Sequence, residues 1–278
     1  MSRTEVKHYK VANGDVQLAV SETGQGQTLL FFNGGGATQV SWKRIIGELR
    51  GQYRLVTFDF RNHGKTTTSH STSLESFLTD AEVMMDKVAS DRPILVGWSL
   101  GADLAVWYAS SHPGRVAGLF LIDGALPVNL VSDPDDVRRR LNTPTMRIGP
   151  LLMYLVGMGY RLTPDEYATL TIELNRRREQ LLSAYEKLDC PVELVLAAKT
   201  AGEKGARAER NNALWRAGEN NSRIYTQSCL SSGWTAPINS HLRNRSASRT
   251  PLTRLSNVFR LACQSQLATS DHHKLPPR

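Results

Sequence analysis

PILVGWSLGADLAVWYASS, residues 93–111, is the stretch that decides the fold. The apolar run 93–96 is typical of a buried strand, and the residues from 102 onward have the composition of a helix. Between them, Gly97 and Gly101 flank Ser99 in a Gly-x-Ser-x-Gly pattern. In a strand-turn-helix context this pattern forms a sharp turn, because the serine adopts a strained backbone conformation that only very small neighbours permit. The sequence therefore predicts Ser99 as a nucleophile at a helix N-terminus, where amides and the helix dipole favour developing negative charge.

Strand and helix patterns alternate on both sides of this turn. Upstream, the sequence predicts extended segments at 8–14, 16–24, 28–35 and 53–60, with helices at 41–51 and 74–89. Downstream, 116–124 and 191–200 have the apolar character of strands. Such alternation predicts an α/β fold with a mostly parallel sheet and helices on both faces.

The segment 127–187 shows no strand pattern and is mostly amphipathic helix. An insertion after the sixth strand would lie above the strand ends, so we expect a helical cap there. The remaining residues 1–126 and 188–219 would form the α/β core.

A glycine-rich turn, NGGG at 33–36, leaves the strand that ends at residue 32. A serine hydrolase directs two backbone amides at the oxyanion, one of them from the residue after the nucleophile, here Leu100. Gly35 or Gly36 can supply the second, and Gly35 is our candidate. Taken alone, three glycines indicate only a flexible turn.

The string DFRNHGKT at 59–66 also follows a strand. The interpretation that we favour is structural, with Asp59 and Arg61 holding a turn that Gly64 permits. We therefore do not expect His63 to be a catalytic base.

Together, NGGG, DFRNHG, GWSLGA, HPGRVAGLFLIDG and the position of the insertion resemble the α/β-hydrolase superfamily, in its branch of small single-domain serine hydrolases with a helical cap. The resemblance covers roughly residues 10–215 and implies the α/β-hydrolase fold, with a triad in the order serine, acid, histidine. It does not specify a substrate, since this fold hosts many chemistries. Asn33 departs from the pattern, because many relatives have histidine there.

The resemblance leaves two positions for the triad acid and none that is clear for the histidine. Asp123, at the end of the sixth strand, is our first candidate; the alternative is Glu203, which follows the seventh strand, because Lys199 stands where the acid is usually found. The histidine should follow an eighth strand near the C-terminus. However, the three histidines in that region follow no strand-like run and are typical of a tail: His241, His272 and His273.

Residues 220–278 carry most of the positive charge of the protein. They contain eight Lys/Arg and one acid, Asp271, which accounts for +7 of the formal net charge of +8. The segment is rich in Ser, Arg, Thr and Pro, a composition that predicts a disordered basic tail. No interleaved aromatic residues or recognised motif accompany the charge, so we expect no nucleic-acid binding.

The codons of this tail allow another interpretation. Residues 233–245 can be back-translated so that reading from the third base gives Leu-Asp-Ser-Thr-His-Gln-Leu-Pro. Extended upstream, the same shift can give the strand-like Tyr-Pro-Val-Leu-Pro-Val-Gln-Trp. The hypothesis is that a frame change near codon 220 replaced the last strand, the catalytic histidine and the closing helix. The chain would then keep its nucleophile and oxyanion hole but lack its general base, at a cost of several orders of magnitude in rate.

The sequence thus predicts a hydrolase of an ester-like bond in a small hydrophobic substrate, impaired by loss of the C-terminal histidine. The alternative is a non-catalytic protein of the same fold that binds a small ligand. Cys190, Cys229 and Cys263 have neither metal-site nor disulfide-framework spacing, and no metal or organic cofactor is implied. The lack of a signal peptide and of any apolar run of about 18 residues predicts a cytoplasmic protein with no membrane segment.

Overall fold

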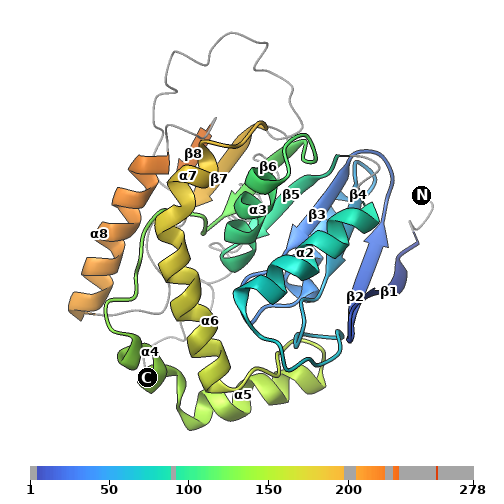
Figure 1. Ribbon diagram of the computed structural model, residues 1–278. Helices are drawn as coiled ribbons and strands as arrows, with labels where there is room; N and C mark the ends of the chain where they lie inside the picture. The colour runs from blue at the N-terminus through green and yellow to red at the C-terminus, as the bar shows by residue number, and fades with distance from the viewer. Residues whose placement is uncertain (1–4, 89–91, 197–204, 223–227, 232–254, 256–278) are drawn as a thin grey trace, which may run out of the picture.

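The computed structural model describes residues 5–88, 92–196, 205–222, 228–231 and 255. Within these residues the strands form one sheet in the order β1-β2-β4-β3-β5-β6-β7-β8 (Figure 1). The strands are β1 (Lys7–Asn13), β2 (Val16–Thr23), β3 (Thr28–Phe32), β4 (Arg54–Phe58), β5 (Ile94–Trp98), β6 (Gly118–Ile122), β7 (Val192–Leu196) and β8 (Ser228–Ser231).

All strand pairs from β4 to β8 are parallel, whereas β2 pairs antiparallel with both β1 and β4. The predicted fold class, a mostly parallel α/β sheet, is therefore confirmed. The helices are α1 (Lys43–Leu49), α2 (Leu74–Val88), α3 (Leu100–Ser111), α4 (Pro134–Leu141), α5 (Pro144–Leu155), α6 (Pro164–Arg177), α7 (Leu181–Tyr185) and α8 (Gly205–Ser222), with 3-10 turns η1 (Gln39–Trp42) and η3 (Arg178–Gln180).

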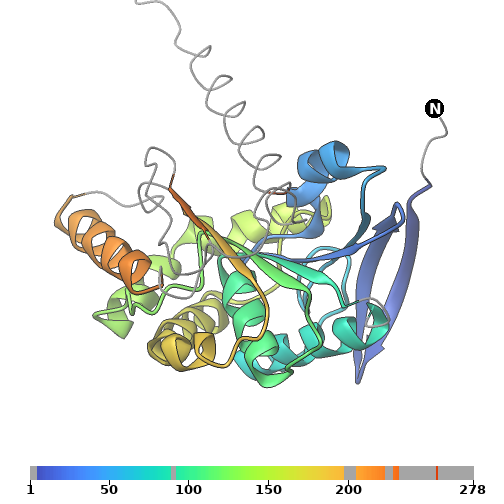
Figure 2. The same ribbon diagram turned by 90° about the horizontal axis from the view of Figure 1, so that it is seen from above.

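Alternate residues of the central strands face two separate hydrophobic clusters. Leu30 and Phe32 of β3 join the larger cluster, which α2, α3 and α7 cover. Leu29 and Phe31 join the smaller one on the other face, against α1 and Leu255. Figure 2 shows α1 on the opposite side of the sheet from α2 and α3. The continuous apolar runs in the sequence are explained by this burial on both faces.

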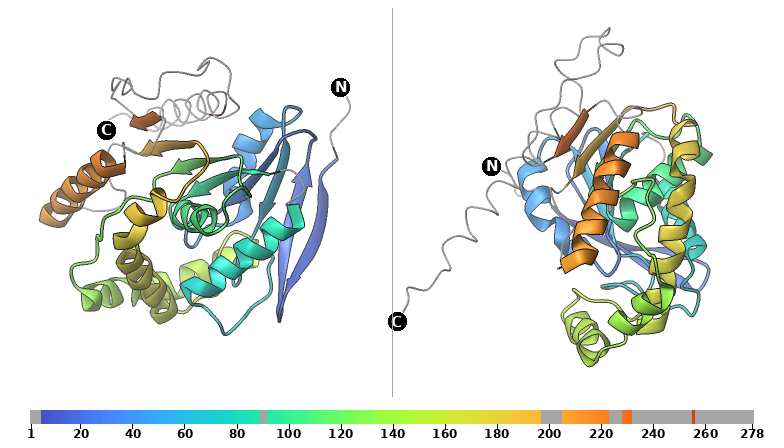
Figure 3. Two further views of the ribbon diagram at one scale, coloured as in Figure 1. Left: turned by 45° about the horizontal axis from the view of Figure 1, so that its top comes forward. Right: turned by 90° about the vertical axis from the view of Figure 1, so that its left-hand side faces the viewer.

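The segment between β6 and β7 is described throughout and contains α4 to α7 without a strand of the sheet. Figure 3 shows α4 and α5 at one end of the molecule, beyond the edge of the core. α6 returns from this end toward the sheet (Figure 1). A Thr163 to Glu166 capping box starts α6, and the Thr143 hydroxyl caps α5 by accepting from the Met146 amide.

Two elements differ from the sequence-based expectations. α8 was not predicted, and it runs past residue 219 to Ser222. β8 pairs in parallel with β7, although SCLS has no apolar strand pattern. The expectation that nothing after residue 219 forms helix or strand is therefore wrong for these stretches, because backbone pairing with an existing strand edge does not require apolar side chains. Residues 223–227, 232–254 and 256–278, on which most of the predicted tail falls, lie outside the described residues.

Candidate functional site

Ser99 lies at the turn between β5 and α3, with backbone angles φ 52° and ψ −117°. Positive φ is rare for a residue with a Cβ and marks stored strain. The backbone around it is well held, because the Ser99 amide donates to the carbonyl of Ile122 at 2.9 Å and its own carbonyl accepts from the amide of Ala102 at 2.9 Å. The turn therefore presents the Ser99 side chain at the N-terminus of α3, and this side chain is half-buried.

Three glycines make this turn possible. A Cβ on Gly97 would lie 2.5 Å from the carbonyl oxygen of Gly101, and a Cβ on Gly101 would collide with the backbone of Phe32 at the end of β3. A Cβ on Gly124, in the loop after β6, would lie 2.9 Å from the Cα of Ser99. Both glycines of the Gly-x-Ser-x-Gly pattern are thus required by close backbone contacts.

The loop 33–38 after β3 runs beside this turn. Asn33 is fully buried and bridges two elements, since its side-chain amide donates to the Phe58 carbonyl at 2.7 Å and its Oδ1 accepts from Trp42 Nε1 at 2.6 Å. In the next turn the Ala37 amide donates to the Gly34 carbonyl at 3.1 Å. Asn33 therefore holds the start of the loop.

Gly35 and Leu100 are neighbours in space. A Cβ on Gly35 would lie 3.9 Å from Leu100 Cδ2. Within the described residues, neither backbone amide donates a hydrogen bond, and Leu100 occupies the first position of α3, whose amides have no partner inside the helix. The two residues therefore lie side by side next to Ser99.

Asp123 follows β6 with φ 45°, and Ala125 two residues later has φ 55°. The Asp123 amide donates to the Val195 carbonyl of β7 at 2.9 Å. Because Gly124 lies against Ser99, this loop comes to the same edge of the sheet as the serine. The structure therefore brings together the sequence candidates Ser99, Leu100, Gly35 and Asp123.

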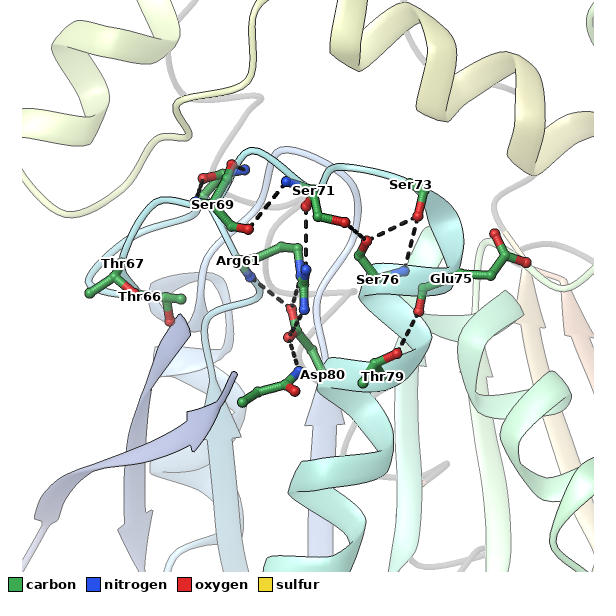
Figure 4. A network of polar contacts seen from close by, with 12 residues as sticks. Arg61, Thr66, Thr67, Ser69, Ser71, Ser73, Glu75, Ser76, Thr79 and Asp80 are labelled. Carbon is green, nitrogen blue, oxygen red and sulfur yellow. Dashed lines mark hydrogen bonds and ion pairs between the residues drawn. The ribbon is translucent and has the colours of Figure 1, made fainter. Parts of the chain in front are cut away.

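The DFRNHG turn has the structural role that its sequence indicated. Asp59 accepts from the backbone amides of Gln39 at 2.7 Å and Lys65 at 3.0 Å. Arg61 forms a buried two-point ion pair with Asp80 of α2, at 3.0 and 2.7 Å, and Figure 4 shows this pair beneath the loop 66–73. Asp80, 19 residues further along the chain, could not be recognised as the partner, since its position on α2 is that of any helical acid.

His63 is buried and neutral. Burial lowers its pKa to about 4, against the opposing effects of the Arg61 carbonyl and Asp80. Its Nε2 accepts from the Gly36 amide at 3.2 Å, so its Nδ1 carries the proton and donates to the Arg61 carbonyl at 2.7 Å. His63 is therefore fully engaged, as expected for a residue that is not a catalytic base.

The α4 to α7 segment contacts this site at two places. Tyr167 of α6 donates its hydroxyl to the Gly35 carbonyl at 3.2 Å. Arg178, directly after α6, makes two hydrogen bonds at 2.9 and 2.7 Å to Asp103 of α3, four residues after Ser99. Burial raises the pKa of Asp103, and the guanidinium of Arg178 and the Ala125 amide oppose that rise. Neither contact could be predicted from the sequence, because each joins distant segments.

A row of exposed apolar side chains runs along α5. Their spacing of three and four residues places them on one helix face, and none of the α5 residues is buried. They are Ile148, Leu151, Leu152 and Leu155.

The other sequence candidates lie outside the described residues: Glu203, His241, His272 and His273. Among the residues that are described, no group of His, Cys, Asp or Glu is arranged to hold a metal ion. Burial raises the pKa of Cys190 to about 11, so its thiol is unreactive at neutral pH. Nor does the described part of the chain contain a helix with the length and apolar character needed to span a membrane.

Comparison with known proteins places this geometry in a family. The profile of the alpha/beta hydrolase fold matches residues 27–178, more than half of the chain. A pimeloyl-[acyl-carrier protein] methyl ester esterase from Nitrosomonas europaea is 26% identical over 170 residues, 60% of this chain and 63% of that protein. Protein phosphatase methylesterase 1 from Bos taurus is 34% identical over 107 residues, 36% of this chain and 28% of that protein. The chain spans less than two thirds of the length of the curated relatives that it matches.

Solved structures share the fold at low sequence identity. A carboxylesterase structure from the thaumarchaeon Nitrososphaera gargenis superposes with a TM-score of 0.62 at 14% identity, covering 80% of this chain and 89% of that chain. The structure of E-2-(acetamidomethylene)succinate hydrolase gives 0.58 at 19% identity, covering 82% and 91%. The strained Ser99 turn, the sheet order and the family match agree, and the chain belongs to the alpha/beta hydrolase fold family.

Proposed function

We propose that this chain is built as a serine hydrolase that cleaves an ester-like bond in a small hydrophobic substrate. The observation that carries the proposal is the backbone of Ser99, strained at φ 52° and placed at the N-terminus of α3 between two obligatory glycines. Such strain persists where the surrounding structure over-determines it, and it is concentrated at functional sites.

In the proposed reaction, Ser99 Oγ attacks the substrate carbonyl carbon and forms a tetrahedral adduct. The Leu100 and Gly35 amides receive the resulting oxyanion, and their lack of other partners among the described residues supports this role. A histidine takes the Ser99 proton and returns it to the leaving alcohol, which leaves an acyl group on Ser99. Water then attacks this acyl group by the same route and releases the acid.

Asp123 is our candidate for the acid that orients this histidine. Its loop packs against Ser99 through Gly124, and its backbone is tied to β7. A carboxylate at this edge of the sheet can reach an imidazole placed over Ser99. Glu203 remains the alternative.

The substrate class follows from the relatives and from the inserted helices. The named esterases among the relatives act on esters. We propose that residues 127–187 form a cap over the substrate, because Tyr167 and Arg178 attach this segment to the turns that flank Ser99. The apolar face of α5 belongs to the same segment and suits a hydrophobic substrate.

We further propose that a frame change near codon 220 removed the catalytic histidine. The concentration of positive charge after that point, and the histidine-containing sequence in the shifted frame, support this interpretation. The second candidate function is a non-catalytic protein that holds a small apolar ligand. The sequence favours it, since the three histidines near the C-terminus follow no strand-like run.

Fluorophosphonate labelling distinguishes the two functions, because an activated serine reacts covalently and an inactive one does not. The experiment compares the wild-type chain with Ser99→Ala and with a control, Ser110→Ala, at the far end of α3. Labelling that requires Ser99 supports the hydrolase, and labelling or p-nitrophenyl ester turnover that survives in Ser99→Ala would refute it. A chain without its histidine also has a poorly activated serine, so the comparison is repeated in the frame-restored chain, where absence of labelling supports the non-catalytic function.

Resequencing of the gene across codons 210–245 tests the frame change. If the shifted frame is recovered, the protein that contains the histidine should hydrolyse p-nitrophenyl esters faster than the present chain by several orders of magnitude. If the present frame stands, a sequencing error is excluded and the chain is an impaired hydrolase. Restoring the shifted frame by mutagenesis should then raise ester turnover, and no gain would refute the frame-change proposal.

A further inference from the structure

The peptide group that joins Gly35 to Gly36 is held from both sides. Its carbonyl oxygen accepts from the Tyr167 hydroxyl at 3.2 Å, and its N–H donates to His63 Nε2 at 3.2 Å. Both polar atoms of one peptide group are therefore engaged by side chains that are far apart in the sequence. The adjacent peptide carries the Gly35 amide, so holding this group restricts the directions in which that amide can point.

We propose that His63 and Tyr167 are positioning residues, which together orient the Gly35 amide toward Ser99 and make the oxyanion hole depend on docking of the cap. The inference rests on the proposed function, because it assigns the Gly35 amide to the oxyanion. It extends that function to two residues outside the predicted site.

His63 is built to accept a hydrogen bond. Its Nδ1 proton is committed to the Arg61 carbonyl at 2.7 Å, which leaves Nε2 as an acceptor for the Gly36 amide. The ring is 1% exposed and packs edge-on against Phe77, with 5.9 Å between ring centroids. It therefore cannot rotate away without losing both hydrogen bonds and a packed contact.

The proposed cap contacts the loop 33–38 and His63 through two tyrosines. The Tyr160 ring stacks on the Tyr167 ring with centroids 5.1 Å apart, and the Tyr160 and His63 ring centroids are 5.7 Å apart. The backbone pairs here as well, because the Gly64 amide donates to the Gly159 carbonyl at 2.9 Å. A Cβ on Gly36, whose φ is 74°, would lie 2.9 Å from the Tyr160 ring. Withdrawal of the cap would thus remove the Tyr167 bond and uncover His63 together.

A purely structural role for these side chains makes a different prediction. Buried hydrogen bonds lost from a structural network lower stability, but they leave the turnover of molecules that remain folded unchanged. Loss of protection at the Gly36 amide shows that the contact holds the loop, and only a positioning role also lowers the kcat of the folded molecules. The two roles are separable by measurement.

Hydrogen exchange at the Gly36 amide tests the inference in the full chain without requiring turnover. We expect His63→Phe, which keeps a ring but has no acceptor, to accelerate exchange by about tenfold or more. Tyr167→Phe removes one oxygen and retains the stacked ring, and we expect it to accelerate exchange at Gly36 severalfold. His63→Gln restores an acceptor and should recover part of the protection. Tyr9→Phe, which loses a 2.9 Å hydroxyl bond to Glu22 on β2, is the matched control.

Kinetics provide the second readout in whichever form of the protein hydrolyses esters. Both Phe variants should lower kcat by roughly 10- to 100-fold, with KM within about twofold, because the amide that they orient acts in the transition state. If Tyr167→Phe leaves both Gly36 exchange and kcat unchanged, the inference is wrong. Tyr167→Phe keeps the test decisive even if His63→Phe does not fold. Failure of Ser99 to react with a fluorophosphonate would overturn the proposed function alone, since the exchange measurement stands without it.

Discussion

The buried ion pair between Arg178 and Asp103 gives the sharpest prediction about stability. The two side chains are 6% and 0% exposed, and two hydrogen bonds of 2.9 and 2.7 Å join them. Arg178→Met keeps an unbranched apolar side chain but removes the charge, which leaves a buried carboxylate with only the backbone amides of Ala125 and Asp103 as named donors. Breaking a buried pair on one side typically costs about 3–5 kcal/mol. That is a large part of the roughly 5–15 kcal/mol by which domains are stable.

Thermal and urea unfolding at pH 8 measure this cost. At about 2–4 °C for each kcal/mol, we expect Tm to fall by roughly 6–20 °C. The control is Arg115→Met, which breaks the exposed 2.7 Å pair with Asp86 and should leave Tm nearly unchanged. The double variant Asp103→Leu with Arg178→Met removes both charges and should recover much of the loss.

The loss should also depend on pH in a known direction. Burial already raises the pKa of Asp103, and removal of Arg178 raises it further. The folded variant then retains a proton that the unfolded chain releases, so its stability falls as pH rises from the unfolded pKa of about 4 toward the raised folded value. The destabilisation should be smaller at pH 5 than at pH 8. An equal loss at both values, or a loss below about 1 kcal/mol at pH 8, would refute the reasoning.

Two further substitutions test the geometry of the turn and of the loop 33–38. Gly101→Ala places a Cβ against the Phe32 backbone, so urea unfolding should show a loss of stability of roughly 3 kcal/mol or more, and any Ser99 labelling should disappear. Gly47→Ala is the control, because there is open space around this position in α1, and it should raise stability by roughly 0.5–1 kcal/mol. Asn33→Leu leaves the Trp42 indole N–H and the Phe58 carbonyl without their partner, so urea unfolding should show a loss of about 2–4 kcal/mol; a loss under about 1 kcal/mol would mean that Asn33 does not hold the loop.

Much of the fold was predictable because it depends on short-range pattern. The apolar runs at β3, β5 and β6 and the helical repeat of α2 indicated a parallel sheet with covered faces, and those elements are where the pattern placed them. β8 and α8 were not predictable in this way. SCLS is polar enough to resemble a loop, and it is a strand because the edge of β7 offers backbone partners. α8 has no marked apolar face, so its sequence carries little helical signal.

The candidate site also combines features that the sequence predicts with contacts that only the folded chain creates. The Ser99 turn could be predicted from five residues, since the steric demand for glycine at 97 and 101 is local to the turn and to the strand beside it. The DFRNHG turn could be recognised as structural, but its partner Asp80 could not. His63 and Tyr167 gave no signal of a shared role, because their contacts with one peptide group arise only when α6 folds back over the loop after β3.

By itself, the sequence determined the alternating strands and helices, the strained turn at Ser99 and the family to which the chain belongs. These features follow from local sterics and from the period of apolar residues, which every short segment carries within itself. The tertiary structure alone decided the Arg178 pair with Asp103, the bridging role of Asn33 and the two-sided hold on the 35–36 peptide. Those contacts join residues tens of positions apart, and their strength comes from burial, which exists only after the chain has folded.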